Sequence, residues 1–134
     1  MVGHAEVIAN TKNMELTEWL KHRKKGIGGS DAAAVAGVNP FKKSMEVFLE
    51  KTDQLSSQKE DNDAMRVGRD LEDYVAQRFE EKRSEDTGEE VKVWNVNQIL
   101  QHPDHKYMLA NMDKRVVGED ALLECKTTVD YNNH

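Results

Sequence analysis

The sequence has little cysteine and no long apolar run. Its single cysteine, Cys125, excludes an internal disulfide bond and fits a reducing cytosol. No segment approaches the roughly 20 consecutive apolar residues that a membrane-spanning helix requires. The first ten residues, MVGHAEVIAN, lack the basic and then apolar pattern of a secretory signal. These absences predict a cytoplasmic protein with no membrane partner.

Internal repeats and low-complexity segments are also absent, and residues 1–134 are enough for a single domain. Hydrophobic residues make up 37% of the chain and charged residues 33%, which is typical of a soluble protein with a modest core. The net charge of −6 argues weakly against general attraction to nucleic acid. Residues 21–25, KHRKK, form a local basic run that suits phosphate contact, although a solvated basic helix end is the commoner interpretation.

The first two thirds of the chain have helical patterns. Short helices are expected within residues 14–52, separated by the glycines of GIGG, and Ser30 is a good N-cap for the helix that follows them. The longest helix is predicted from about residue 64 to about residue 84. Its apolar stripe consists of Leu71, Val75 and Phe79.

After Gly88 the pattern changes to β-branched and aromatic residues with partial alternation. The segments VKVWNVNQILQH, KYMLANMDKRVV and ALLECKTT predict three strands between about residue 90 and residue 128. The expected fold class is α/β, with helices first and a three-stranded antiparallel meander after them.

The last two predicted strands carry charges at suggestive positions. Side chains alternate along a strand, so Glu124 and Lys126 share one face. A turn at residues 118–119 places Asp113 opposite Glu124, whereas a turn at residues 119–120 places it opposite Lys126. A three-residue turn would break this parity unless a bulge restored it. The spacing therefore allows an Asp–Glu–Lys cluster without requiring it.

Carboxylates opposed across two strands repel each other, and a divalent cation between them removes that repulsion. Such hard oxygen ligands suit Mg²⁺ or Mn²⁺. A third carboxylate, Glu72, borders the apolar stripe of the long helix, and Gly68, one turn earlier, allows close approach of the strands. On spacing alone, an ordinary salt bridge of Lys126 with Asp113 or Glu124 on a solvated face is the favoured alternative.

Two further motifs contain residue types that could bind a ligand. In RKKGIGGSDAAA, Arg23 and a helix start at Ser30 would suit an anion, although an ordinary turn and N-cap fit equally well. His102 and His105 offer a weak zinc motif, because no partner His or Cys pair stands at ligand spacing. A polar turn through Pro103 and Asp104 is the better interpretation of those histidines.

Four segments, in order, resemble the YqaJ-type viral recombinases, phage-type alkaline exonucleases similar to lambda exonuclease within the PD-(D/E)xK nuclease superfamily. They are RKKGIGGSDAAAVAGVNPFKKSMEVFLEKT, MRVGRDLEDYVAQRF, HPDHKYMLANMDKRVV and LLECKTT, and together they span roughly residues 19–128. A lone ExK is a weak signal, whereas the ordered set with IGGSDAA and GxxLE is a strong one.

This resemblance implies a restriction-endonuclease-like core and a role for each matching residue. Glu72, Asp113, Glu124 and Lys126 would be catalytic, and the first three would bind metal together with the carbonyl of Cys125. Asp113 follows a methionine here, where the family usually has a proline. The implied cofactor is Mg²⁺, with Mn²⁺ as a substitute.

The resemblance also gives Arg23 and Ser30 the role of binding a DNA 5′ phosphate. The implied activity is 5′-to-3′ exonuclease action on double-stranded DNA ends during phage recombination in a bacterial cytoplasm, beside a single-strand annealing protein. Family members usually continue past the ExK strand, so we expect a fragment with an uncovered sheet edge that favours self-association. The alternatives are a catalytically incomplete DNA-binding or interaction fragment, and a structural domain without metal.

Overall fold

The computed structural model describes residues 4–56 and 62–128. The chain divides into two compact units, and each is described by itself. The first comprises residues 1–58 and 97–111, and the second comprises residues 59–96 and 112–134. Within the described ranges, no helix is both long enough and apolar enough to cross a membrane.

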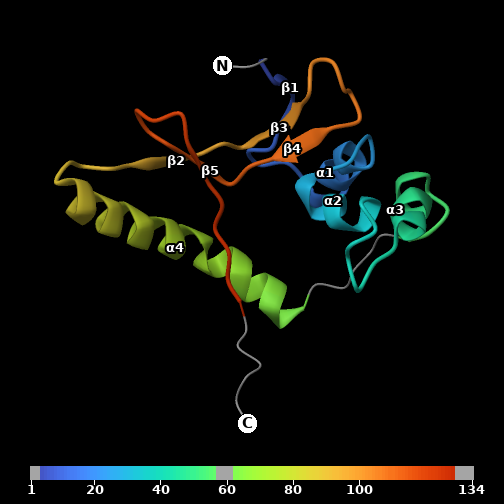
Figure 1. Cartoon of the computed structure of the whole chain (residues 1–134), viewed down its shortest axis with the longest axis horizontal. Coiled ribbons are helices and arrows are strands. Elements are labelled where there is room, and N and C mark those ends of the chain that lie inside the picture. Colours follow the sequence, from blue (N-terminus) through green and yellow to red (C-terminus); the bar gives the residue numbers. More distant parts are fainter. Residues whose placement is uncertain (1–3, 57–61, 129–134) are drawn as a thin grey trace, which may run out of the picture. The chain divides into compact units, whose positions relative to one another are not determined.

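The first unit combines a small antiparallel sheet with three short helices (Figure 1). Its sheet has the strand order β1-β3-β4. The strands are β1 (Glu6–Asn10), β3 (Gln98–Gln101) and β4 (Leu109–Asn111), and the helices are α1 (Leu16–Arg23), α2 (Gly29–Val35) and α3 (Ser44–Lys51). Ile99 on β3, Ala34 on α2 and Val47 on α3 are buried and form its apolar centre.

A glycine allows the segment before α2 to lie against β4. Ile27 exchanges backbone hydrogen bonds with this region, donating to the carbonyl of Tyr107 and accepting from the N–H of Leu109. A Cβ atom on Gly26 would lie 2.5 Å from the Tyr107 carbonyl oxygen, so only glycine fits there without movement of the backbone. This contact fixes the start of α2, and with it Ser30, beside the sheet.

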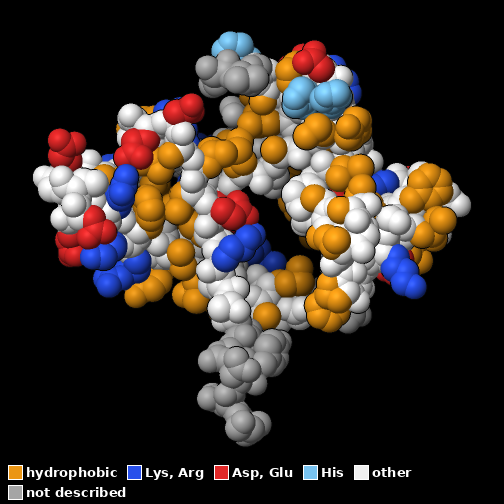
Figure 2. Space-filling view, in the orientation of Figure 1, with side chains coloured by type: hydrophobic (Ala, Val, Ile, Leu, Met, Phe, Trp, Pro, Cys, Tyr) orange, Lys and Arg blue, Asp and Glu red, His pale blue; other side chains and the backbone are white. Residues whose placement is uncertain are grey.

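The second unit consists of a long helix and a second three-stranded sheet with the order β2-β5-β6. The elements are α4 (Asp63–Thr87), β2 (Val93–Asn95), β5 (Lys114–Val116) and β6 (Leu122–Leu123). The side chain of Asn62 caps α4 by accepting from the Met65 N–H, and Gly88 ends the helix in the left-handed conformation. Figure 2 shows charged side chains of both signs over the C-terminal half of α4, where Arg78 pairs with Glu81.

The structure corrects the predicted single meander, although it confirms a mixture of helices and antiparallel sheet. VKVWNVNQILQH breaks at Asn97, whose φ of 50° is left-handed, and contributes β2 to one sheet and β3 to the other. KYMLANMDKRVV likewise breaks between Asn111 and Lys114 into β4 and β5. β1 was not predicted. Ser30 is not the N-cap of α2, because that position is held by Gly28.

Candidate functional site

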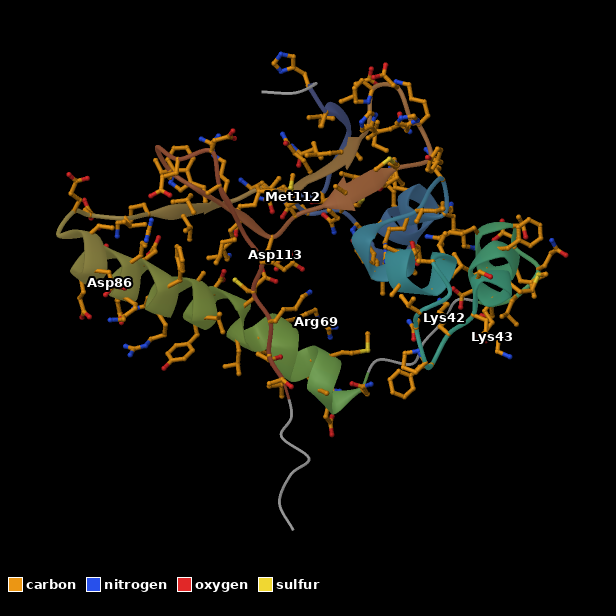
Figure 3. All side chains as sticks on the ribbon, viewed as in Figure 1. Lys42, Lys43, Arg69, Asp86, Met112 and Asp113 are labelled. Atoms are coloured by element: carbon orange, nitrogen blue, oxygen red, sulfur yellow. The ribbon has the colours of Figure 1, made fainter. Side chains whose placement is uncertain are left out.

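The register of the β5–β6 hairpin, extended by one residue past the ladder, would set Asp113 opposite Glu124. Lys114 pairs with Leu123, and the Val116 N–H donates to the Ala121 carbonyl at 3.0 Å. This is the register predicted for a turn centred on residues 118–119. The ladder ends at Leu123, and the next contact is a hydrogen bond of 2.9 Å from the Cys125 N–H to Asp113 Oδ2. Figure 3 labels Asp113 beside Met112, just before β5.

Glu124 and Lys126 form an ion pair with each other. Lys126 Nζ lies 2.6 Å from Glu124 Oε1, and the two side chains are 78% and 52% exposed, respectively. The hydrogen bond to Glu124 raises the pKa of Lys126. One of the two salt bridges considered as the alternative is therefore present, and exposed pairs of this kind contribute little to stability.

Glu72 projects from α4 toward the same hairpin. Burial raises the pKa of its carboxyl group, and the negative charge of Asp113 raises that pKa further. Close approach is possible because a Cβ atom on Gly68 would lie 3.2 Å from the hydroxyl of Thr127. The close approach that Gly68 was expected to allow is confirmed. Glu72 is also near enough to Asp113 for their charges to interact.

Cys125 lies close to the acidic side chains of Asp113, Glu72 and Glu124. Burial raises the pKa of its thiol, and the charge of Asp113 adds to the effect. Its backbone N–H is the group that binds Asp113. A thiol with a raised pKa is a poor nucleophile and a poor metal ligand, which leaves the carbonyl as the atom that this residue offers to a cation.

Sequence reasoning missed Lys114, which is buried between α4 and the sheet. Its ammonium group donates to Asp73 Oδ1 at 2.7 Å and to Asn95 Oδ1 at 2.5 Å, and it lies 3.7 Å from Glu72 Oε1. The sequence gave one indication of this burial. Lys114 and Val116 are two positions apart on β5, so their side chains lie on the same, buried face of the strand. Lys114 also lines a pocket of about 320 Å³. The other lining residues are Asp73, Ala76, Gln77, Glu80, Val93, Trp94 and Asn95.

The chemistry of these donors fits a hard divalent cation. Asp113 and Glu72 are near enough for one charge to raise the pKa of the other, and a cation between them would reverse that effect. In residues 4–56 and 62–128, however, no three His, Cys, Asp or Glu side chains converge as ligands. The donor set therefore suits Mg²⁺ or Mn²⁺, while binding would require the side chains to draw closer.

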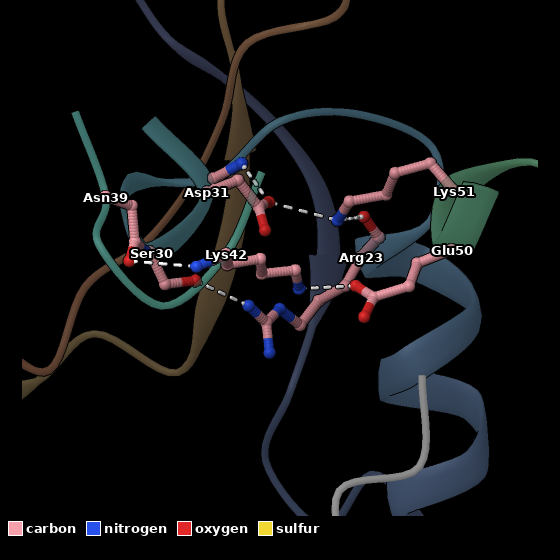
Figure 4. Close-up of polar contacts among 8 residues, drawn as sticks. Arg23, Ser30, Asp31, Asn39, Lys42, Glu50 and Lys51 are labelled. Carbon is pink, nitrogen blue, oxygen red and sulfur yellow. Dashed lines mark hydrogen bonds and ion pairs between the residues drawn. The ribbon is translucent and has the colours of Figure 1, made fainter. Parts of the chain in front are cut away.

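In the first unit, the predicted Arg23 and Ser30 lie together (Figure 4). Arg23 Nη2 donates to Ser30 Oγ at 2.8 Å, and its guanidinium lies 4.7 Å from the centre of the Trp19 ring. Nearby Lys51 donates to the Arg23 carbonyl at 2.8 Å. Arg23 is thus held through its stacking partner, its side chain and its backbone.

Asp31 is the buried acid of this region. Its carboxylate accepts from the Gly28 N–H at 3.0 Å and pairs with Lys51 Nζ at 3.1 Å. Burial opposes its charge, but the Gly28 hydrogen bond, Lys51 and Arg23 together lower the pKa of Asp31. The carboxylate is therefore already neutralised by partners, and Arg23 keeps donors for another oxygen.

The two histidines form a turn. His102 Nδ1 accepts from the backbone N–H groups of Asp104 and His105, each at 3.1 Å. The two rings lie 4.8 Å apart between centres. Because one nitrogen of His102 is engaged by the backbone, the polar-turn interpretation is confirmed.

Comparison of the sequence with known proteins shows the family of this chain. A family model described as the YqaJ-like viral recombinase domain matches residues 18–134. Over 128 residues, the chain is 44% identical to the uncharacterized protein YqaJ of Bacillus subtilis (strain 168), covering 96% of this chain and 38% of that protein. The chain thus spans under half the length of this relative. No solved structure matches. The chain belongs to the YqaJ-like viral recombinase domain family.

Proposed function

We propose that this chain carries the catalytic centre of a Mg²⁺-dependent DNA nuclease that hydrolyses phosphodiester bonds at double-stranded ends, from 5′ to 3′, in phage recombination. The observation that carries the proposal is the gathering of Glu72 and Asp113 around one hairpin. Glu72 lies 3.7 Å from Lys114, the residue after Asp113, and Asp113 accepts a hydrogen bond from the N–H of Cys125, the residue after Glu124. Family membership supports a role in recombination, and the family is generally one of metal-dependent nucleases.

The residues of the second unit would divide the work between metal binding and charge stabilisation. Glu72, Asp113, Glu124 and the carbonyl of Cys125 would hold Mg²⁺ or Mn²⁺, which when bound supplies positive charge at the scissile phosphate. Lys126 would assist the attacking water or stabilise charge on the phosphate by donating hydrogen bonds from its ammonium group.

Arg23 and Ser30 would bind the terminal 5′ phosphate. A guanidinium group offers paired donors that match phosphate oxygens, and Ser30 adds a hydroxyl next to it. The Trp19 ring limits the rotation of the guanidinium plane. Since the N-cap is Gly28, the proposal rests on these side chains and not on a helix end capped by Ser30.

A nuclease assay with matched variants tests this function. The substrate is a 5′-phosphorylated duplex with a 3′ fluorophore, supplied with Mg²⁺ or with EDTA. The wild-type chain should degrade it only with Mg²⁺, and Asp113→Asn or Glu124→Gln should lower the rate at least about 100-fold. Lys82→Ala is the control, because Lys82 is an exposed lysine on α4 that pairs with Asp86. Equal rates for the wild-type chain and Lys126→Ala would show that the chain is not a working enzyme.

A second candidate is a DNA-binding fragment that does not turn over. Two observations favour it: no three ligands converge within the part of the chain that the structure describes, and Lys126 is already paired with Glu124. Fluorescence anisotropy with 5′-phosphorylated duplex separates the two candidates. Binding that weakens with salt, together with no hydrolysis in Mg²⁺ or Mn²⁺, would favour this candidate.

The wider setting follows from the same proposal. A recombination nuclease would work in the bacterial cytoplasm on duplex DNA, with a single-strand annealing protein as its partner. The described sheet of the second unit has β2 and β6 at its edges, and strands with an unpaired edge favour self-association into a homo-oligomer. Light scattering over a concentration series tests this association, and a constant mass of one chain would contradict it.

A further inference from the structure

Lys114 is unusual because it is a lysine whose side chain is only 4% exposed, although it lies on a strand of a small sheet. It shares its face of β5 with buried Val116. Burial of a charge is costly unless partners compensate for it. Lys114 is also one residue after Asp113, so whatever holds its side chain also fixes the backbone of the hairpin at the acidic site.

The partners of Lys114 come from two other elements. Asp73 lies on α4 and Asn95 lies on β2, and each accepts a hydrogen bond from the ammonium group. These bonds connect the helix to two strands of the sheet. The hydrogen bonds to Asp73 and Asn95, together with the nearby carboxylate of Glu72, compensate for burying the ammonium group.

The positive charge offsets an acidic group. Glu72 and Asp73 are neighbours on α4, and Asp113 is close enough to Glu72 to raise its pKa. Lys114 lies 3.7 Å from Glu72 and 2.7 Å from Asp73. Asp73 is 88% exposed and can turn to solvent, whereas Glu72 is only 37% exposed and depends more on a nearby cation.

We propose that Lys114 is a positioning residue, a built-in counter-ion that holds Glu72 beside Asp113 before a metal ion arrives. The inference rests on the proposed function, in which Glu72 and Asp113 are metal-binding carboxylates. Its rival is a plain helix-to-sheet salt bridge to Asp73. The two differ in one respect: only the counter-ion role couples Lys114 energetically to Glu72.

A double-mutant cycle in EDTA at pH 8 tests this coupling on the whole chain. Lys114→Met keeps an unbranched side chain that is one heavy atom shorter, and it should lower the melting temperature by about 5 °C. Adding Glu72→Gln should restore at least half of that loss, because one uncompensated carboxylate is removed. Lys114→Arg should keep most of the stability. Lys82→Met is the matched control and should not couple to Glu72.

The outcomes distinguish the counter-ion from the plain salt bridge. If Glu72→Gln restores nothing in the Lys114→Met background, and Asp73→Asn alone reproduces the full loss, Lys114 is only a salt bridge to Asp73 and the proposal is overturned. If Lys114→Met does not fold, the same coupling is measured between Lys114→Gln, which removes the charge but keeps a polar side chain, and Glu72→Gln. The absence of coupling there overturns the proposal equally.

Divalent cations provide a second readout. Mn²⁺ should raise the melting temperature of Lys114→Met by more than that of the wild-type chain, because the ion supplies the missing positive charge. Sodium chloride at equal ionic strength should not reproduce the difference. Equal shifts in the two proteins would count against the counter-ion role. If the wild-type chain binds no Mn²⁺ by calorimetry, the proposed function loses its metal site, while the coupling in EDTA still decides the role of Lys114.

Discussion

Among the residues that the structure describes, each unit buries one charged side chain, and the two have opposite signs. In the first unit the buried residue is Asp31, which has Lys51 and a backbone N–H as partners and Arg23 nearby. In the second unit it is Lys114, which lies among Asp73 and Glu72. The surroundings of the acid are therefore basic and the surroundings of the lysine are acidic.

This difference is consistent with the proposed division of roles between the two units. A basic surrounding with free guanidinium donors suits a phosphate, whereas an acidic surrounding with hard oxygen atoms suits a divalent cation. A nuclease that starts at a phosphorylated end needs both. The net charge of −6 conceals this separation, because it sums the two regions into one number.

The largest expected effect on stability comes from the buried acid. Asp31→Ala removes the acceptor of the Gly28 N–H and leaves Lys51 without its carboxylate, so the free energy of unfolding should fall by roughly 2–3 kcal/mol. Urea unfolding followed by circular dichroism measures this loss. Asp86→Ala is the control, because Asp86 pairs with Lys82 on the exposed surface of α4 and its removal should change little. Equal losses in the two variants would contradict the importance of burial here.

The next effect tests whether the first unit recognises phosphate. Arg23→Ala should slow degradation of 5′-phosphorylated duplex about tenfold, which corresponds to about 1.4 kcal/mol, and should leave a 5′-hydroxyl duplex unaffected. Parallel rate measurements on the two substrates provide the check. An equal loss on both ends would mean that Arg23 contributes to the fold rather than to recognition of the end.

A smaller effect contrasts the two units by pH. The pKa of Asp31 is lowered on folding. Its contribution to the free energy of unfolding is therefore fully present above the pKa of the unfolded chain, and it is lost as pH falls through the pKa of the folded chain. The pKa of Glu72 is raised on folding. Its contribution to the free energy of unfolding is therefore fully present below the pKa of the unfolded chain, and it is lost as pH rises through the pKa of the folded chain.

Neutral substitutions should therefore act in opposite directions. At pH 8, Glu72→Gln should stabilise the metal-free chain by about half a kcal/mol, a small value because the carboxylate is partly exposed and screened. Asp31→Asn should destabilise it. Both differences should vanish at a pH below the two folded values. Urea midpoints from pH 3 to pH 8 give the comparison, and shifts of the same sign in both variants would contradict it.

Sequence patterns predicted the parts that depend on local spacing. The stripe through Leu71, Val75 and Phe79 located α4, whose observed bounds are Asp63–Thr87. Strand alternation narrowed the hairpin to two registers, and the observed pairing of Lys114 with Leu123 matches the one predicted for a turn at residues 118–119. These features could be inferred because neighbours in the sequence determine them.

The parts that were missed depend on distant contacts or on single dihedral angles. The break at Asn97 requires a left-handed residue inside a β-prone run, which alternation does not reveal. Lys114 resembles any surface lysine until Asp73, 41 positions earlier, is brought beside it. β1 pairs with β3, some 90 residues away, and its exposed pattern gave no sign of that partner.

The smallest expected effect on stability belongs to Lys126. Its side chain is 78% exposed and its partner Glu124 is 52% exposed, so Lys126→Met should change the free energy of unfolding by at most a few tenths of a kcal/mol. The same substitution should abolish most of the nuclease activity if Lys126 donates to water or phosphate. Urea unfolding and the duplex assay on one protein sample separate these two effects. A variant that loses stability and activity together would assign Lys126 to the fold, whereas loss of activity alone distinguishes it from Lys114, which is buried and fixed.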